Sequence, residues 1–203
     1  MKEESKKPRG PRKITARRLE NIALHYLQRF ATSAENLRRV LMRRVDRSAY
    51  HHDTDRDEGA AAVDDLVERY RKSGLLDDHA YAEGRTTALL RRGVAPRTVR
   101  QRLREKGVDP DAIDAALRSA AEDNPDIDLA AAIRLARRRR LGPYRLGNDR
   151  LERRDKDLAA LARAGFAYDT ALAVIDAETP EALEDGVQFG PDESSLRYVR
   201  DEI

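Results

Sequence analysis

Apolar residues recur along the first third of the chain with the 3.6-residue period of amphipathic helices. The clearest stripe follows Thr15, which can cap a helix start, and consists of Leu19, Ile22, Ala23, Tyr26, Leu27 and Phe30. Ser33 can cap a second helix, whose apolar face is Leu37, Val40, Leu41 and Val45. A third stripe, Val63, Leu66, Val67 and Tyr70, predicts a helix that ends near Ser73 and Gly74.

The stretch from Gly74 to Val108 predicts two further helices. Asp77 or Asp78 supplies a side-chain oxygen for the helix start, and Tyr81, Ala82, Arg85, Ala88 and Leu89 form one stripe. Gly93 should end this helix, because glycine tolerates the left-handed conformation past a helix terminus. Pro96 suits the first turn of the next helix, which Gly107 stops.

The pattern then repeats toward the C-terminal part of the chain. Asp109 and Pro110 begin a helix with Ile113 and Leu117 inside, and another begins near Asp128 and reaches a Gly/Pro loop at 142–148. Two more helices follow, one ending at Gly165 and one carrying Ala171, Leu172 and Ile175. We expect the segment Ser48 to Gly59 to be a loop or a frayed helix end, because it has no apolar period.

Equal spacing supports an internal repeat. Leu103, Gly107, Val108, Ile113 and Leu117 are spaced like Leu161, Gly165, Phe166, Ala171 and Ile175. In the first copy Val45 stands where the glycine is expected. We therefore predict an all-α fold of three tandem three-helix units, 14–74, 75–122 and 123–177, in an elongated, curved array.

Composition agrees with short helices that have thin cores, since 38% of the residues are charged and 5% are aromatic. The absence of cysteine excludes disulfides and thiolate chemistry and is compatible with the cytosol. No apolar run is long enough to cross a bilayer, so we expect a cytoplasmic protein with no membrane partner.

The net charge of +3 is unevenly distributed. Residues 1–13 hold six basic against two acidic residues, and residues 178–203 hold eight acidic against two basic residues. We expect both ends to be disordered, the first as a basic arm and the second as an acidic tail. The tail either folds back on the basic body and restrains DNA binding, or only aids solubility.

The central motif resembles that of the RecX family of recombination regulators. It consists of Gly74, Asp77, Asp78, Tyr81, Ala82, Arg85, Gly93, Leu103, Lys106, Gly107 and Val108. The segments TSAENLRRVLMRRV and ARAGF resemble flanking parts of the same family, and the likeness spans roughly residues 15–177. The departures are Val45, the loop around His51 and His52, the arm and the tail.

This resemblance implies a protein that binds RecA recombinase filaments on single-stranded DNA. It implies inhibition of their ATPase, strand-exchange and co-protease activities, with no catalytic residue and no cofactor of its own, and so a role in DNA repair and the SOS response. The alternative is a basic helical module that binds single- or double-stranded DNA independently of RecA. We expect a monomer.

The leading candidates for partner contact form a basic surface around the Gly93 turn. They are Arg85, Arg91, Arg92, Arg97, Arg100, Arg104 and Lys106, joined by Arg102. A solvated helix face would have the same pattern. Asp77 and Asp78 are interpreted as caps, Tyr81 as core, and Arg85 either as a structural residue or as a contact.

Two other features have weaker functional interpretations. The run Arg137 to Arg140 could bind phosphates, but four consecutive residues spread around a helix. His51, His52 and the following aspartates have metal-ligand types, yet adjacent side chains rarely converge on one ion, so we expect no metal site. Phosphate-loop, serine-elbow and di-iron motifs are lacking in the sequence.

Overall fold

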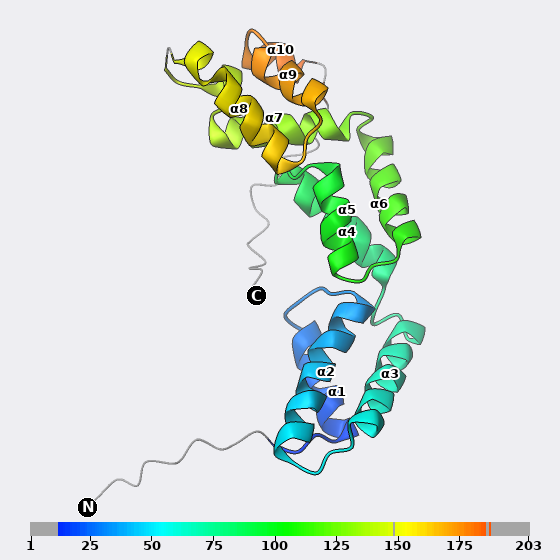
Figure 1. The fold of residues 1–203 in the computed structure, drawn as a ribbon. Coiled ribbons are helices and arrows are strands. Elements are labelled where there is room, and N and C mark those ends of the chain that lie inside the picture. Colours follow the sequence, from blue (N-terminus) through cyan, green and yellow to red (C-terminus); the bar gives the residue numbers. More distant parts are fainter. Residues whose placement is uncertain (1–11, 148, 186, 188–203) are drawn as a thin grey trace, which may run out of the picture. The chain divides into compact units, whose positions relative to one another are not determined.

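The structure is a computed structural model that describes residues 12–147, 149–185 and 187. These residues form ten α-helices and one short 3₁₀ helix and contain no strand, so the predicted all-α class is confirmed (Figure 1). The helices are α1 (Ala16–Leu27), α2 (Ala34–His51), α3 (Arg56–Lys72), α4 (Asp78–Arg91), α5 (Pro96–Glu105), α6 (Pro110–Asp123), α7 (Ile127–Arg139), η1 (Gly142–Tyr144), α8 (Arg150–Ala164), α9 (Tyr168–Asp176) and α10 (Pro180–Glu184). None of them is both long enough and apolar enough to span a membrane.

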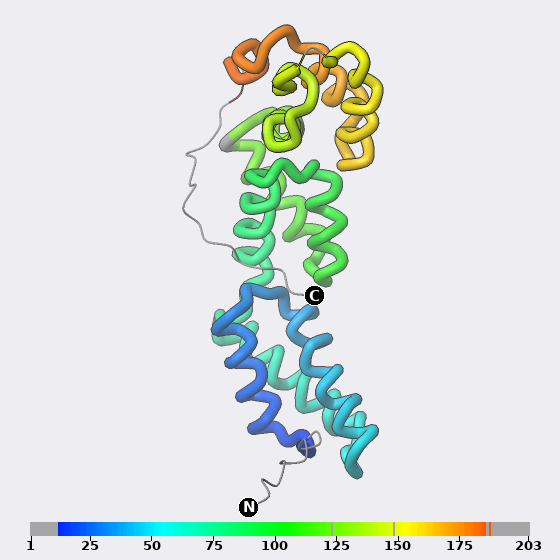
Figure 2. The backbone as a smooth tube through the Cα atoms, turned by 90° about the vertical axis from the view of Figure 1, so that its left-hand side faces the viewer, coloured from blue at the N-terminus to red at the C-terminus, as the bar shows by residue number. Residues whose placement is uncertain are grey.

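The chain divides into two compact units, one ending at Asp78 and one beginning at His79. In the first unit each of α1, α2 and α3 packs against the other two (Figures 1 and 2). Their facing stripes bury Leu19, Leu37, Leu41, Val45 and Val63 almost completely. The predicted apolar periodicity therefore produces this core, although Phe30 lies beyond the end of α1.

The connection between α2 and α3 is shorter than the sequence predicts. Helix α2 continues to His51 and α3 begins at Arg56, so most of the expected loop is helical. Val45 is the physical reason, because a valine in place of the expected glycine lets the helix continue. Gly59 of α3 lies against Val45, and a Cβ at Gly59 would stand 2.5 Å from a Val45 methyl group.

Side-chain caps fix several helix starts. Thr15, Ser33 and Asp109 accept hydrogen bonds from backbone amides of α1, α2 and α6, which confirms these three predicted caps. Asp78 differs, because its carboxylate accepts from the amide of Ala34 at 2.8 Å. It thereby caps the start of α2, although Asp78 itself is the first residue of α4.

In the second unit α7 is the central element, packing against α5, α8 and α9. Figure 1 shows α8 and α9 side by side, and their inner faces bury Leu161, Val174 and Ile175 against α7. The buried carboxylate of Asp157 accepts hydrogen bonds from the amide of Gly142 and from Nε and Nη2 of Arg145. These bonds hold the loop between α7 and α8.

The predicted acidic tail is not uniformly without structure. Its first residues form α10, capped by Thr179, and Leu183 is buried in the core of the second unit. Glu184 accepts hydrogen bonds from Arg137 and from the hydroxyl of Tyr144. The rest of the predicted tail, 188–203, and most of the basic arm lie outside the described residues.

Candidate functional site: an arginine pocket in the second unit

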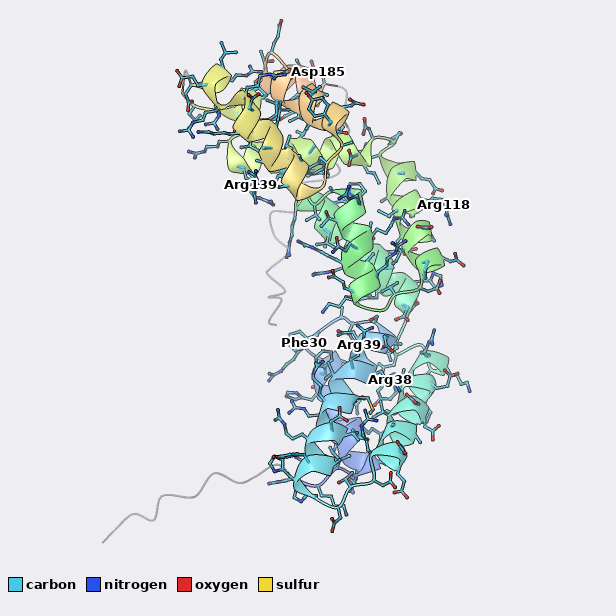
Figure 3. The ribbon with its side chains drawn as sticks, in the orientation of Figure 1. Phe30, Arg38, Arg39, Arg118, Arg139 and Asp185 are labelled. Atoms are coloured by element: carbon cyan, nitrogen blue, oxygen red, sulfur yellow. The ribbon has the colours of Figure 1, made fainter. Side chains whose placement is uncertain are left out.

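An open pocket of about 380 Å³ lies in the second unit where α5, α7 and α8 come together. Its basic lining comes from all three helices and consists of Arg97, Arg102, Arg138, Arg139 and Arg163. We call this set the arginine pocket. Figure 3 shows Arg139 at the end of α7, with its side chain directed away from the helix.

Two glycine turns form part of the pocket wall and allow the helices to approach closely. Gly93 has φ +71, and a Cβ there would stand 2.6 Å from the backbone nitrogen of Leu135 on α7. Gly165 has φ +99, and a Cβ there would stand 2.6 Å from the hydroxyl oxygen of Thr98 on α5. Both glycines stand at the helix stops that the sequence predicts, and their missing side chains also let neighbouring helices bring their arginines together.

A hydrogen bond fixes α5 against the end of α8. The hydroxyl of Thr98 donates to the carbonyl of Ala164 at 3.1 Å. Arg138 donates to the carbonyl of Arg92, which ties the end of α7 to the Gly93 turn. The pocket is therefore held by specific polar contacts between residues that are far apart in the sequence.

None of the five pocket arginines forms an ion pair with an acid among the described residues, and the printed bond of Arg138 goes to a backbone carbonyl. Elsewhere in the same unit arginines are neutralised, as Arg154 is by Asp176 at 2.6 Å. The described lining includes no acidic side chain. Like charges held close together with no counter-charge favour an anionic partner.

The start of α5 adds to this positive potential. Its N-cap, Ala95, provides no side-chain acceptor for the first amides of the helix, and Pro96 occupies the first turn. The helix dipole places partial positive charge at this end, beside Arg97 and Thr98 of the pocket. Carboxylates and phosphates are the groups that such an arrangement can bind.

The structure places the predicted contact residues in different settings. Arg97 lines the pocket, whereas Arg91, Arg92 and Arg104 are exposed nearby on α4, its following turn and α5. Arg100 is turned toward α6, where Asp114 holds its guanidinium, and it does not line the pocket. Arg85 is half-buried on α4 and Lys106 is exposed at the end of α5.

Sequence reasoning gives too little weight to three pocket residues. Arg138 and Arg139 belong to the Arg137 to Arg140 run, and the turn of α7 does spread that run, since Arg137 instead pairs with Glu184. Arg163 is absent from the predicted contact residues. Its position two residues before Gly165 matches that of Arg91 before Gly93, and this shared spacing is the signal that could have identified it.

The motif residues have structural settings. Ala82 and Leu103 are buried, Tyr81 is half-buried against the same core, and Gly74, Gly93 and Gly107 have positive φ. This segment also matches a family model. The model described as "RecX, second three-helix domain" matches residues 77–117.

Similarity to known proteins extends well beyond that segment. The Regulatory protein RecX of Myxococcus xanthus is 43% identical over 176 residues, which cover 86% of this chain and 93% of the relative. The chain belongs to the RecX family. Regulatory protein RecX of Agrobacterium fabrum is 35% identical over 84% of this chain and 88% of its own length.

Solved RecX structures share the fold. A crystal structure of regulatory protein RecX has a TM-score of 0.57 at 25% identity and covers 80% of this chain and 72% of that chain. RecX from Lactobacillus salivarius, at 19% identity, has a TM-score of 0.55 over 79% of this chain and 94% of that chain. The expected family is thus confirmed, and membership of the RecX family supports a regulatory role for this chain.

Proposed function

We propose that this protein is a negative regulator of RecA. In this proposal it binds the RecA filament on single-stranded DNA and lowers the filament's ATPase, strand-exchange and co-protease activities, without catalysing a reaction itself. Family membership supports the regulatory role. The observation that carries the molecular part is the arginine pocket, whose five arginines lack acidic partners among the described residues.

We also propose that the chain consists of the three predicted three-helix units, 14–74, 75–122 and 123–177, and that the pocket arginines contact the filament. Arg97, Arg102, Arg138, Arg139 and Arg163 would bind anionic groups of the nucleoprotein filament, with Arg91, Arg92 and Arg104 on the neighbouring exposed surface. A nucleoprotein filament presents both carboxylates on protein and phosphates on DNA. Guanidinium groups recognise both through paired hydrogen bonds.

Charge reversal in the pocket tests the proposal. The variant carries Arg97→Glu, Arg102→Glu and Arg163→Glu, and the assay follows ATP hydrolysis by the cognate RecA on single-stranded DNA. The native protein should inhibit well below one molecule per RecA subunit. The triple variant should need about tenfold more protein or worse, because each reversal replaces attraction by repulsion.

A matched control is available in the same unit. Arg118 on α6 is exposed, has no acidic partner in the described part of the chain, and points away from the pocket arginine Arg139 (Figure 3). Arg118→Glu should inhibit like the native protein. Equal inhibition by the triple variant, with helicity retained by circular dichroism, would contradict the proposed site.

DNA binding independent of RecA is the second candidate. The pocket supports it because its arginines, which have no acidic partner among the described residues, can bind phosphates. Its described lining contains no aromatic side chain, so contact would be with phosphates rather than bases. In that case the affinity for DNA alone should fall steeply with salt, and RecA inhibition should disappear when excess DNA is supplied. Inhibition that persists with excess DNA favours the RecA proposal.

A further inference from the structure

A second basic surface lies in the first unit, on α2, and includes an aromatic side chain. Arg43, Arg47 and Tyr50 are spaced four and three residues apart, so they share one face of this 18-residue helix. All three side chains are exposed, and Tyr50 is 85% exposed. We call this set the α2 face.

The arginines of this helix surface are available for a partner. Arg43, Arg44 and Arg47 form no ion pair with any described acid, although the same helix pairs Arg39 with Glu35 and Asp46 with Arg56. The two acidic residues of α2, Glu35 and Asp46, are therefore already paired with other arginines. The three remaining guanidinium groups need an anion from outside the described chain.

Tyr50 is the feature that a plain basic helix does not explain. Its ring meets the edge of the His51 ring at 4.9 Å between centroids and an interplanar angle of 89°, so no ring stacks flat on it there. Exposing a large aromatic ring to water is energetically unfavourable, and the Tyr50 ring is not part of the buried core of this unit. Beside unpaired arginines, it is suited to a partner that offers both negative charge and flat aromatic groups.

The start of the described chain brings more positive charge to the same end of α2. Ser48 of α2 is buried, and its hydroxyl oxygen accepts the amide of Ile14 at 2.9 Å and contacts the Thr54 hydroxyl at 2.7 Å. This bond anchors the chain directly after Arg12 and Lys13, both of which are exposed. Arg12 and Lys13 therefore lie close in the chain to the residue that is bonded near the end of α2 that carries Tyr50.

We propose that the α2 face is a binding site for single-stranded nucleic acid, with a base stacked on Tyr50 and phosphates held by Arg43 and Arg47. Along the helix these arginines are about 6 Å apart and Tyr50 follows about 4.5 Å further on. In duplex DNA the faces of the bases are covered by their neighbours in the stack. A duplex could therefore contact Arg43 and Arg47 through its phosphates but could not stack a base on Tyr50. An acidic protein surface likewise offers no base for Tyr50.

The test compares single-stranded and duplex oligonucleotides with the full-length protein and no recombinase. Fluorescence anisotropy of a labelled oligothymidylate and of a labelled duplex of equal length gives the two affinities. Tyr50→Ala should weaken binding of the single strand about fivefold or more and leave the duplex unchanged, because only the single strand loses a stacked base. Tyr50→Phe, which keeps the ring, should retain native affinity for both.

Charge variants and a second tyrosine complete the design. Arg43→Glu with Arg47→Glu should weaken single-strand and duplex binding together and reduce the salt dependence of both. Tyr168→Ala is the matched control, because Tyr168 is also largely exposed but lies in the second unit. It should change neither affinity.

Three results would overturn the proposal. They are a Tyr50→Ala variant that binds the single strand normally, one that loses single strand and duplex equally, and a Tyr168→Ala variant with the same effect as Tyr50→Ala. A Tyr50→Ala variant with normal single-strand affinity but impaired RecA inhibition would assign the α2 face to protein contact, against the proposal. Because the binding assay contains no recombinase, its failure leaves the proposed regulation of RecA standing.

Discussion

Glycine at position 93 shows how one missing side chain positions the functional surface. Gly93 combines a left-handed backbone with contact distances to α7 that no Cβ can occupy, since Ala131 O would lie 2.9 Å away and Leu135 N 2.6 Å away. Close approach of the turn to α7 is what allows Arg138 to reach the carbonyl of Arg92. The same residue thus ends α4 and lets the turn after it approach α7.

Gly93→Ala should destabilise the second unit. The left-handed conformation alone costs an alanine about 1–3 kcal/mol, and the overlap with the α7 backbone adds to it. Urea denaturation followed by circular dichroism measures the loss. Recombinase inhibition should also weaken, because the pocket arginines on α5 and α7 lose their spacing.

A second glycine gives the control for this substitution. Gly84 lies inside α4 with an ordinary helical backbone, and a Cβ added there would have no neighbouring described atom within 4 Å beyond its own helix backbone. Gly84→Ala should raise stability by about 0.5–1 kcal/mol, because alanine has the better helix propensity. Equal effects at the two positions would show that the contact with α7 is unimportant.

Residue roles that depend on local chemistry could be predicted from the sequence, whereas those that depend on packing could not. Thr15, Ser33 and Asp109 act on amides two or three residues away, so their capping roles follow from sequence pattern. Arg163 meets Arg97 only through the packing of α8 near α5. Asp78 accepts a hydrogen bond from the amide of Ala34, 44 residues away in the sequence, and no local sequence pattern predicts that bond.

At the scale of helices, α8 and α9 are joined by an exposed pair that should make their packing sensitive to acid. Arg154 holds Asp176 through two hydrogen bonds of 2.7 and 2.6 Å. Hydrogen bonding to Arg154, and then the charges of Arg154 and Arg150, lower the pKa of Asp176 below its ordinary value. The folded state therefore favours the ionised carboxylate.

The sign of the pH effect follows from that direction. A carboxyl group with a lowered pKa in the folded state contributes stability above its ordinary pKa and loses it as the pH falls through the lowered value. Asp176→Asn should reduce stability slightly at neutral pH, and the difference from the native protein should vanish in acid. The effect is small because both side chains are more than one third exposed.

Urea denaturation of both proteins over a series of pH values measures this difference. Asp155→Asn is the control, because the Asp155 side chain is 94% exposed and lies 3.7 Å from Arg154. It should change stability little at any pH. A difference for Asp176→Asn that grows as the pH falls would contradict the assigned ion pair.

Helix boundaries follow from the sequence where a glycine or proline marks them and less well elsewhere. The sequence correctly marks the start of α5 at Pro96. It also correctly marks the ends of α4, α5 and α8, which are followed by Gly93, Gly107 and Gly165. Helix α2 runs past Val45 because nothing there breaks it, and α10 escapes prediction because its apolar contribution is short, with Leu183 buried inside an acidic segment. The charge pattern alone predicts disorder in this segment, although Leu183 packs in the buried core.

At the scale of the whole molecule, two separate cores carry two separate candidate surfaces. The core of the first unit includes Leu41 and supports the α2 face, and the core of the second includes Ile133 and supports the arginine pocket. Each core is built from residues of its own unit. Damage to one core should therefore leave the other unit folded.

Leu41→Ala tests this independence, since Leu41 is fully buried in the first unit. The cavity should cost that unit about 2–5 kcal/mol, which native-state hydrogen exchange would record as faster exchange of amides in α1, α2 and α3. Amides of α7 and α9 should keep their protection, and Ile133→Ala should give the reverse pattern. If Leu41→Ala accelerates exchange equally throughout, the two units unfold as one, and losses measured at the α2 face could no longer be separated from losses at the arginine pocket.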